Sequence, residues 1–451
     1  MPFFICYCEC RKYNKTISKN ELLTHRRNPI KILKFTLSHE LLKQINPLSS
    51  IVNPINSYSS SRIKIKMSDN VPLEIREEIM KRLPVKWLIQ FRSVCKAWKS
   101  LIDSTDFINH YSGQTQYLLA RYKNRVDYKL KYALFPDDHT FPHKRLSLNC
   151  HPLVNMLYCP KSIGFSHGLL CFYGDYQEGS DDTPFSATGR AVVWNPSIRK
   201  AVAVDVPNVS NELVYETFLG FGVCGETNDP KLVKISYIIT RWLDRESVPD
   251  SIPWQVEVYT LSTGAWRRPF SSNLPRKSIH FEPYQVVIDG MLYWLATDGT
   301  IGVDGGYQSY NLIISLDITS EEFREVNLPH ELAHLSIDLL SLCKLRESLV
   351  VIELDIETRN LVFRVWMMED IVPKSFTKLF SIDIPDNVSE VYLKGFRKTG
   401  EPIIDSASRY PEWTGSLAVY DPYSKSISSL GVDGSDISSF EYSYIETLLL
   451  L

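Results

Sequence analysis

Apolar residues recur at every fourth position between residues 75 and 83, which predicts a short amphipathic helix. The three positions are Ile75, Ile79 and Leu83. Acidic and basic residues occupy the other faces of this helix and form two i,i+4 pairs. Asp69 or Asn70 is a suitable N-cap, Pro72 suits the first turn, and Pro84 prevents the helix from continuing.

Two further stretches with helical spacing follow directly. One carries Leu88, Phe91 and Cys95 on one face, and the next carries Val94, Trp98, Leu101 and Ile102. Three small helices in about forty residues bury too little apolar surface to be comfortably stable alone. We therefore expect this module to pack against a partner or against the rest of its chain.

From residue 116 onward the helical pattern gives way to short β-like runs bounded by Pro, Gly, Asn and Asp. Residues 117–135 predict a first hairpin. Five later segments share one plan, in which an apolar strand, a polar turn and a returning strand follow each other. They are AVVWNPSIRKAVAV, VEVYTLSTGAWRRP, IISLDITSEEFREV, RVWMMEDIVPKSFTKL and LAVYDPYSKSISSL.

These hairpins repeat at the spacing of a propeller blade. Their first strands end 65, 57, 50 and 54 residues apart, at Trp194, Tyr259, Leu316, Trp366 and Tyr420. In three hairpins a second apolar residue follows at seven positions, as Trp266, Phe323 and Ile427. Asn195-Pro-Ser and Asp421-Pro-Tyr place proline second in a type I turn, behind a side chain that can accept the amides of the turn. With the strand candidates between the hairpins, each unit offers about four strands.

The pattern predicts a mainly β protein with a small N-terminal α module of three helices and a β-propeller-like domain of about six blades. Five or seven blades remain open alternatives. The hairpin at 117–135 and the terminal YSYIETLLLL are expected to join in the sixth blade, because an unpaired last blade would expose a long edge strand.

Residues 71–108 resemble the F-box of plant substrate receptors, through VPLEI, a second EI, RLPVKWLIQFRSVCKAWKSLI and a trailing Phe107-Ile108. The resemblance implies docking on a Skp-type adaptor, which links the chain to the cullin and RING subunits of a ubiquitin ligase. It assigns no chemistry to the F-box itself. The usual leucine before the first proline is Val71 here, for which we expect weaker packing without loss of docking.

The resemblance also implies which residues contact the adaptor. The matching positions are Pro72, Ile75, Ile79, Leu83, Pro84, Val85, Leu88, Phe91, Val94, Cys95 and Trp98. The alternative is that such residues form only the module's own small core. We expect Leu101 and Ile102 to face inward.

Residues 160–451 resemble the F-box-associated, kelch-like domain of the same plant family. The matching pieces are SHGLLCF, VVWNPSIRK, LGFGVCGETNDPKLVKI, WQVEVYTLSTGAWR, GMLYWLA, ISLDITSEEFREVNLP and YIETLLLL. Gly305-Gly306 is the only Gly-Gly pair, so kelch describes the expected shape and not a repeated motif. Self-incompatibility F-box proteins share this layout, and the sequence leaves membership of that subgroup open.

These features divide the chain into residues 1–66, 67–112 and 113–451. The first segment holds twelve Lys or Arg and three Asp or Glu, a net charge of +9, which leaves −11 for residues 67–451 out of the total of −2. We expect a basic, disordered extension, with Met67 as a natural start before the helix cap. An organelle transit segment and a metal site at Cys6, Cys8 and Cys10 are weaker alternatives.

The nine cysteines show no regular framework, which is typical of a reducing compartment. No apolar run approaches the roughly 18 residues that span a bilayer. The net charge of −2 argues against a dedicated nucleic-acid binder. We expect a location in the cytoplasm, the nucleus or both, with neither membrane nor nucleic acid as a partner.

Catalysis has little support in the sequence, and we predict no cofactor and no metal. His167 and Cys171 share a strand face, but Cys171 lies inside the apolar run LLCF, where a small core residue is expected. No P-loop, HExxH, GxSxG or paired-carboxylate arrangement rises above chance. The many Trp and Tyr residues, which can stack bases or sugars, are expected to form apolar layers between blades.

The leading hypothesis is a substrate-recognition subunit of a Skp-cullin-F-box ubiquitin ligase, in which the propeller binds an unidentified target protein. A ligand-binding or regulatory protein that uses the F-box outside a ligase is the alternative, and an enzyme acting in the propeller channel is a more distant one. The polar loops at 175–190, 242–254 and 298–311 are candidates for target contact, with unconstrained surface loops as the alternative.

Overall fold

The computed structural model describes residues 73–124, 130–176, 189–207, 215–238, 255–276, 278–301, 307–356, 361–369, 374–384, 391–408, 414–434 and 439–450. These residues form two compact units that meet in sequence between Gln114 and Thr115. The predicted extension 1–66, the capping residues before α2 and Pro72 lie outside the described residues. No helix in the described ranges is both long enough and apolar enough to cross a membrane.

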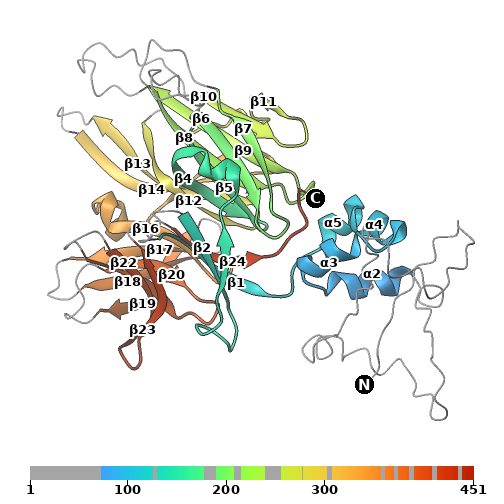
Figure 1. The fold of residues 1–451 in the computed structure, drawn as a ribbon. Helices are drawn as coiled ribbons and strands as arrows, with labels where there is room; N and C mark the ends of the chain where they lie inside the picture. Colours follow the sequence, from blue (N-terminus) through green and yellow to red (C-terminus); the bar gives the residue numbers. More distant parts are fainter. Residues whose placement is uncertain are drawn as a thin grey trace, which may run out of the picture. The chain divides into compact units, whose positions relative to one another are not determined.

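The first unit is a module of four short helices (Figure 1). They are α2 (Leu73–Lys81), α3 (Val85–Phe91), α4 (Lys96–Ile102) and α5 (Thr105–His110). The first three match the predicted segments, and α5 is one more helix than expected. Ser104 caps α5 by accepting a hydrogen bond of 3.3 Å from the backbone N–H of Phe107. Six residues are too few to show the apolar periodicity of a helix, so the sequence analysis did not predict α5.

The module has its own small core. Val85, Leu88, Ile102 and Phe107 are fully buried in it. The hydroxyl of Tyr111 donates a hydrogen bond of 2.7 Å to the backbone carbonyl of Leu83, which ties the end of the module to the turn after α2. Burial of Ile102 agrees with the expectation that it faces inward.

The second unit contains six antiparallel four-stranded sheets, which confirms a six-bladed propeller. From the inner to the outer strand, blade 1 contains β4 (Leu157–Ser166), β5 (Leu169–Tyr176), β6 (Gly189–Asn195) and β7 (Lys200–Asp205). Blade 2 contains β8 (Tyr215–Val223), β9 (Pro230–Ile238), β10 (Gln255–Thr260) and β11 (Ala265–Arg267). Blade 3 contains β12 (Ile279–Ile288), β13 (Met291–Ile301), β14 (Tyr307–Asp317) and β15 (Phe323–Asn327).

Blade 4 contains β16 (Leu340–Leu345), β17 (Ser348–Asp355), β18 (Val362–Glu369) and β19 (Ser375–Asp383). Blade 5 contains β20 (Val391–Phe396), β21 (Pro402–Ser408), β22 (Thr414–Asp421) and β23 (Ser426–Gly434). Blade 6 contains β24 (Ser439–Ile445), β1 (Gln116–Lys123), β2 (Leu130–Pro136) and β3 (Leu146–Asn149). The short helices α6 (Pro152–Asn155), α7 (His330–Ala333) and η3 (Ile337–Leu339) lie in links between blades.

The five predicted hairpins form the third and fourth strands of blades 1 to 5. The apolar pairs at a spacing of seven face each other across the strands, as Tyr259 with Trp266, Leu316 with Phe323 and Tyr420 with Ile427. The predicted turn mechanism is also confirmed. The carboxamide oxygen of Asn195 accepts from the N–H of Ser197 at 2.9 Å, and the carboxylate of Asp421 accepts from that of Tyr423 at 2.9 Å.

The ring closes where the two ends of the domain pair. Strand β24 runs antiparallel beside β1, as expected for the terminal segment (Figure 1). The chain then continues onto blade 1, where Thr447, Leu448 and Leu449 are buried. Gly168 permits this close passage, because its φ of +75° suits glycine and an added Cβ would lie 2.4 Å from the carbonyl oxygen of Ile445.

Apolar layers fill the spaces between adjacent blades. The layer between blades 6 and 1 includes Tyr132 and Trp194, whose ring centroids are 5.2 Å apart. Trp294 and Tyr420 are buried in the layers between blades 2 and 3 and between blades 4 and 5. For these residues the expected role of the aromatic side chains as layers between blades is confirmed.

Alternation of strand direction defines two faces of the propeller. The turn face carries the links between first and second strands and between third and fourth strands, including His167–Gly168, Asn195–Arg199 and Asp317–Glu321. The loop face carries the links between second and third strands and from each blade to the next. The chain enters β1 at Gln116 on the turn face, because this residue pairs with Ile445 at the end of β24.

All three candidate target loops lie in sequence between the second and third strands of a blade, and the described strand ends that flank them are on the loop face. Most of their residues lie outside the described ones. The prediction of a loop over all of 298–311 was partly wrong, since β13 and β14 extend into this segment from its two ends and pair as far as Ile301 with Tyr307. Period-two alternation is weak in this stretch, which explains the error.

Candidate functional site

The helical module exposes apolar side chains on several helices. Ile75 on α2 is 46% exposed. Ile79, Pro84, Phe91, Val94, Cys95 and Trp98 are half-buried. Phe91 and Trp98 meet edge to face, with ring centroids 4.8 Å apart. These accessible positions, taken together with Ile75, are called the accessible apolar set below.

Three residues proposed from sequence as adaptor contacts are instead buried inside the module. Val85 and Leu88 are completely buried and Leu83 is 8% exposed. Their side chains are core residues in this structure, and their contact with an adaptor stays a prediction. The spacing of apolar residues did not separate these two roles, because both faces of α3 carry apolar side chains.

An ion-pair group stabilises the second half of the module. Arg92, after α3, places its guanidinium on the carboxylate of Asp103, with a distance of 3.0 Å from Nη2 to Oδ2. Lys99 on α4 reaches the same carboxylate at 2.6 Å. Hydrogen bonds from Arg92 and Lys99 hold the pKa of Asp103 below its usual value. The group fixes the end of α4 against the turn after α3.

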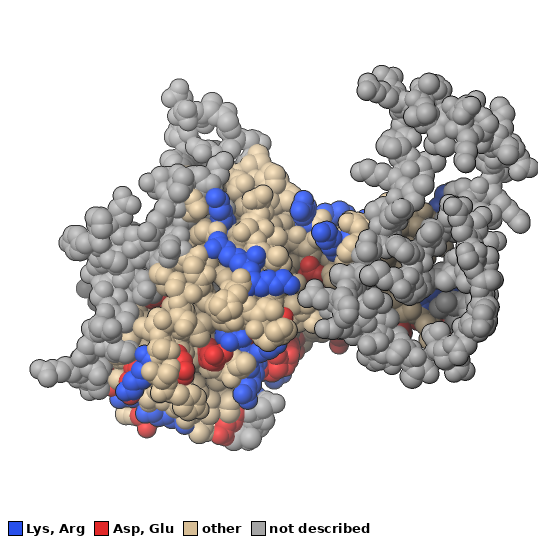
Figure 2. Space-filling view, turned by 60° about the horizontal axis from the view of Figure 1, so that its bottom comes forward, with Lys and Arg blue, Asp and Glu red and all other residues tan. Residues whose placement is uncertain are grey.

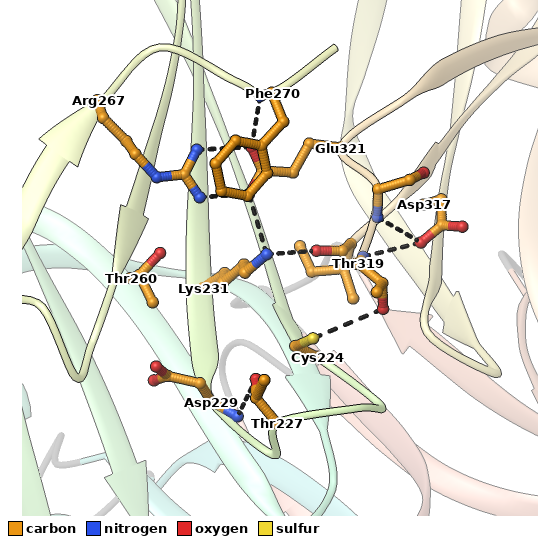
Figure 3. Close-up of polar contacts among 12 residues, drawn as sticks. Cys224, Thr227, Asp229, Lys231, Thr260, Arg267, Phe270, Asp317, Thr319 and Glu321 are labelled. Carbon is orange, nitrogen blue, oxygen red and sulfur yellow. Dashed lines mark hydrogen bonds and ion pairs between the residues drawn. The ribbon is translucent and has the colours of Figure 1, made fainter.

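On the propeller, the most developed polar cluster lies at the junction of blades 2 and 3 (Figure 3). Glu321 is fully buried in the turn between β14 and β15. Its carboxylate accepts hydrogen bonds from Lys231 at 2.9 Å and from Arg267 at 2.6 Å and 2.7 Å. The backbone N–H of Phe270 donates to it at 2.9 Å, and the Phe270 ring lies 3.8 Å from the Arg267 guanidinium carbon.

This cluster joins two blades. Its carboxylate is fully engaged by hydrogen bonds, so it is not available for proton transfer. Burial alone would raise the pKa of Glu321, but hydrogen bonds from Arg267 and Lys231 outweigh it and lower the pKa. Glu321 is therefore ionised at neutral pH. The same ammonium of Lys231 also donates to the backbone carbonyl of Ile318 at 2.8 Å. We assign the cluster to holding the blades together.

Similar polar contacts join other blades. Asp137 of blade 6 is buried and pairs with Arg397 after β20 at 2.9 Å. The Tyr420 hydroxyl of blade 5 donates to the carbonyl of Asp383 in blade 4 at 2.6 Å. The indole of Trp266 in blade 2 donates to the carbonyl of Asp205 at the end of β7 in blade 1 at 2.9 Å. Blade packing thus uses side chains that local sequence patterns do not connect.

Near the propeller axis, Gln285 on β12 links two inner strands. Its carboxamide accepts from the N–H of Phe221 at 3.0 Å and donates to the carbonyl of the same residue at 2.6 Å. Gly164 on β4 gives it room, since a Cβ there would lie 2.0 Å from the amide nitrogen of Gln285. This side chain therefore fills the space between β4, β8 and β12 at that level.

Three tyrosines are exposed on the inner strands of alternate blades. They are Tyr158 on β4, Tyr284 on β12 and Tyr392 on β20, with exposed fractions of 55%, 73% and 48%. Tyr158 and Tyr392 lie at the strand ends that reach the loop face. Sequence reasoning missed them, because it grouped all aromatic residues with the layers between blades.

The suggested thiol-imidazole pair is not supported by its environment. His167 lies in the turn between β4 and β5, whereas Cys171 is fully buried in the strand core, and burial raises the pKa of its thiol. The letters Gly164-Phe-Ser-His-Gly168 do form a GxSxG pattern. Ser166, however, is buried in a hairpin and its hydroxyl accepts from the N–H of Val223 at 3.1 Å, so it does not sit in a strand-to-helix elbow.

Charges of both signs lie close together on one part of the propeller surface. Figure 2 shows acidic and basic side chains next to one another over the lower part of the propeller in view. Blade 3 carries ion pairs between accessible side chains, such as Arg276 with Glu325 and Arg324 with Glu322. The acidic total of the chain therefore does not appear as a single-sign field over that region.

Comparison with protein families identifies both units. A model described as an F-box domain matches residues 68–110, and one described as an F-box associated beta propeller domain matches residues 176–409, more than half of the chain. The chain belongs to the F-box proteins with an F-box-associated propeller. The helical module is thus the F-box, and the six blades are the F-box-associated propeller.

Several proteins of Arabidopsis thaliana are similar to this chain. The F-box/kelch-repeat protein At3g23880 is 26% identical over 279 residues, which cover 58% of this chain and 66% of that protein. F-box protein At2g21930 is 26% identical, covering 57% and 60%, and F-box protein CPR1 is 24% identical, covering 70% and 74%. The chain spans somewhat less than two thirds of the length of the first two.

Among solved structures, the hemagglutinin-neuraminidase ectodomain of parainfluenza virus 5 is 7% identical with a TM-score of 0.38, covering 65% of this chain and 74% of that one. A likeness at this level carries no argument about function. The F-box-associated propeller described above rests on its own six sheets and on the family match.

Proposed function

We propose that this protein is the substrate-recognition subunit of a Skp-cullin-F-box ubiquitin ligase. The F-box docks on a Skp-type adaptor, which brings the cullin and RING subunits, and the propeller holds a target protein near the conjugating enzyme. The chain itself contributes position and no chemistry, because holding reactants together is sufficient to accelerate transfer between them. The single observation that carries the proposal is the presence of an F-box and an F-box-associated propeller in one chain.

The accessible apolar set supports docking by the F-box. The module leaves Ile75 46% exposed, and Phe91 and Trp98, which pack against each other, stay half-buried and so keep apolar surface available to a partner. Burial of such side chains against a partner stabilises a complex by roughly 25 cal/mol per Å² of apolar surface before association costs. We therefore place adaptor contact on these side chains and treat Val85 and Leu88 as their support.

The loop face of the propeller is where we place target binding. Tyr158 and Tyr392 expose aromatic surface at this face, and Ile356, directly after β17, adds an aliphatic side chain with 63% exposure. Aromatic side chains provide large contact area at low cost in conformational entropy. The chain enters the propeller on the opposite, turn face, so its covalent connection does not occupy the loop face.

Capture of the adaptor tests the proposal directly. We expect Ile75→Glu to abolish capture of a recombinant Skp-type adaptor by the full chain, because a carboxylate cannot enter an apolar interface without a partner. The exposed Glu78 on the same helix provides a matched control, and Glu78→Gln should leave capture intact. Equal capture by wild type and Ile75→Glu would refute docking through this surface.

A second measurement separates ligase function from the alternative of a regulatory protein that uses its F-box outside a ligase. Deletion of residues 67–110 should leave target binding by the propeller intact and lengthen the lifetime of the bound target. An unchanged lifetime with retained binding would favour the alternative. We further propose that the protein acts in the cytoplasm or nucleus, where such ligases meet their targets.

A further inference from the structure

The link between β15 and β16 contains an arrangement that the F-box function does not use. It begins with α7, whose residues and C-cap are His330-Glu331-Leu332-Ala333-His334, an H-E-x-x-H pattern. Two histidines at i and i+4 lie on one side of a helical turn, which is the spacing used by helical metal sites. Five letters alone occur by chance, so the argument depends on the local structure.

The backbone of this turn is firmly held. Leu332 is completely buried against the propeller. The side-chain amide of Asn311, itself 3% exposed, donates hydrogen bonds of 3.0 Å and 2.8 Å to the carbonyls of Leu332 and Leu335. The N–H groups of Leu332 and Ala333 both bond the carbonyl of Pro329 at 2.9 Å. The turn that carries the histidines is therefore fixed before any ligand arrives.

The two imidazoles lie together at the surface. His330 and His334 are both exposed, and their ring centroids are 4.6 Å apart at an interplanar angle of 58°. Within the described ranges, neither ring has a hydrogen bond or an ion pair with another group. Two adjacent imidazoles whose nitrogens are uncommitted are a ready pair of donors.

We propose that His330 and His334 form a two-histidine site for a divalent transition-metal ion such as Ni²⁺ or Zn²⁺. Neutral imidazole is a preferred ligand of these ions, with metal-nitrogen distances of about 2.0–2.1 Å. A centroid separation of 4.6 Å places the two rings close enough to share one ion. Preorganisation of this kind improves affinity by reducing the ordering cost.

The site binds metal without the features of a metalloprotease. Helix α7 has four residues, and the described part of the chain contains no group of three or more His, Cys, Asp or Glu side chains placed to hold an ion. Two protein ligands leave the other coordination positions to water or to a donor from a bound protein. Because the β15–β16 link belongs to the loop face, such a donor would come from a protein bound there.

Titration of the full chain with NiCl₂, followed by calorimetry in metal-free buffer, tests the proposal. We expect the double substitution His330→Asn and His334→Asn to weaken binding at this site by roughly 100-fold, the loss expected when a linked ligand pair is removed. Both side chains are exposed, so the unfolding midpoint without metal should stay unchanged. Ni²⁺ should raise that midpoint for the wild type and not for the variant.

The chain offers a matched control. His139 and His143 have the same i,i+4 spacing and are also exposed, but their rings make no contact with each other in the described structure. The substitutions His139→Asn and His143→Asn should leave Ni²⁺ affinity at the level of the wild type. Equal affinity of the wild type and the His330/His334 variant, or an equal loss in both double variants, would overturn the proposal.

Discussion

The side-chain amide of Asn195 donates a hydrogen bond of 2.8 Å to the backbone carbonyl of Leu449, across 254 residues of sequence. The same nitrogen donates to the carbonyl of Thr447 at 3.1 Å, and the side chain is completely buried. A turn residue of blade 1 therefore holds the segment that follows β24 and completes the ring.

Replacement of Asn195 by alanine should loosen this closure. Two buried carbonyls lose their partner, and each unsatisfied group costs about 1–3 kcal/mol, so we expect the free energy of unfolding to fall by about 3 kcal/mol. Denaturant unfolding of the purified chain measures the change. Asn149→Ala, at an exposed position of β3, is the control and should change stability little. A similar effect of the two substitutions would contradict the assigned role.

Glu321 should make the stability of the junction between blades 2 and 3 depend on pH. Because its pKa is lower in the folded chain than in the unfolded chain, its stabilisation is present above the unfolded value, about 4.3, and is lost as the pH falls through the folded value. Glu321→Gln should lower the free energy of unfolding by about 3 kcal/mol at pH 7, and the difference from the wild type should shrink below about pH 4. Unfolding curves measured from pH 3 to pH 7 follow this change.

The neighbouring Glu322 provides the control for this experiment. It forms a surface pair with Arg324 at 2.8 Å, and such pairs contribute about 0–1 kcal/mol. Glu322→Gln should therefore have a small effect at every pH. A constant difference between Glu321→Gln and the wild type over the whole pH range would show that charge is not what Glu321 contributes.

Gly164 and Gln285 are expected to be energetically coupled. Gly164→Ala forces the Gln285 carboxamide away from both backbone groups of Phe221, which should lower the free energy of unfolding by about 1–3 kcal/mol. In a Gln285→Ala background the same glycine substitution should cost much less, because the obstructed side chain is gone. A double-mutant cycle measures this difference. Gly225→Ala, with no atom within 4 Å of the added Cβ, is the control, and simple additivity at Gly164 would argue against the contact.

Tyr111 should stabilise the F-box from its last turn. Tyr111→Phe removes the hydrogen bond to the carbonyl of Leu83 and is expected to lower the stability of the module by about 1 kcal/mol. Hydrogen exchange of the amides in residues 73–110 reports on the module within the full chain, and exchange there should become faster. Tyr423→Phe is the control, because Tyr423 on the propeller is 98% exposed, and this substitution should leave the exchange rates unchanged.

Target binding on the loop face predicts where a protein can be crosslinked. A photoreactive phenylalanine analogue at Tyr158 or Tyr392 should form adducts with a protein that accumulates when residues 67–110 are deleted. The same analogue at Tyr423, in the turn between β22 and β23 on the opposite face, should form fewer of them. More adducts from position 423 than from both other positions would place the target on the turn face.

Several features of the fold were predictable because they depend on neighbours in sequence. Hairpin partners such as Tyr259 and Trp266 are seven residues apart, and the capping of the Asn195 and Asp421 turns is complete within three residues. Helix α5 escaped prediction because six residues contain too little of a period. The sequence predicted the accessible apolar set only as part of a longer group of apolar residues. The spacing of apolar residues does not distinguish a side chain that is buried, such as Leu88, from one that faces solvent, such as Ile75.

The sequence by itself determined the order of the elements, the presence of an F-box before a propeller of about six blades, and the strands that pair through tight turns. These follow from period, turn chemistry and motif, which act over a few residues. Only the tertiary structure decided which polar groups meet between blades, as Asn195 with Leu449 and Glu321 with Lys231, and that His330 and His334 stand on an anchored turn. Closure of the ring brings distant residues together, and no local pattern encodes the partner that each of them will meet.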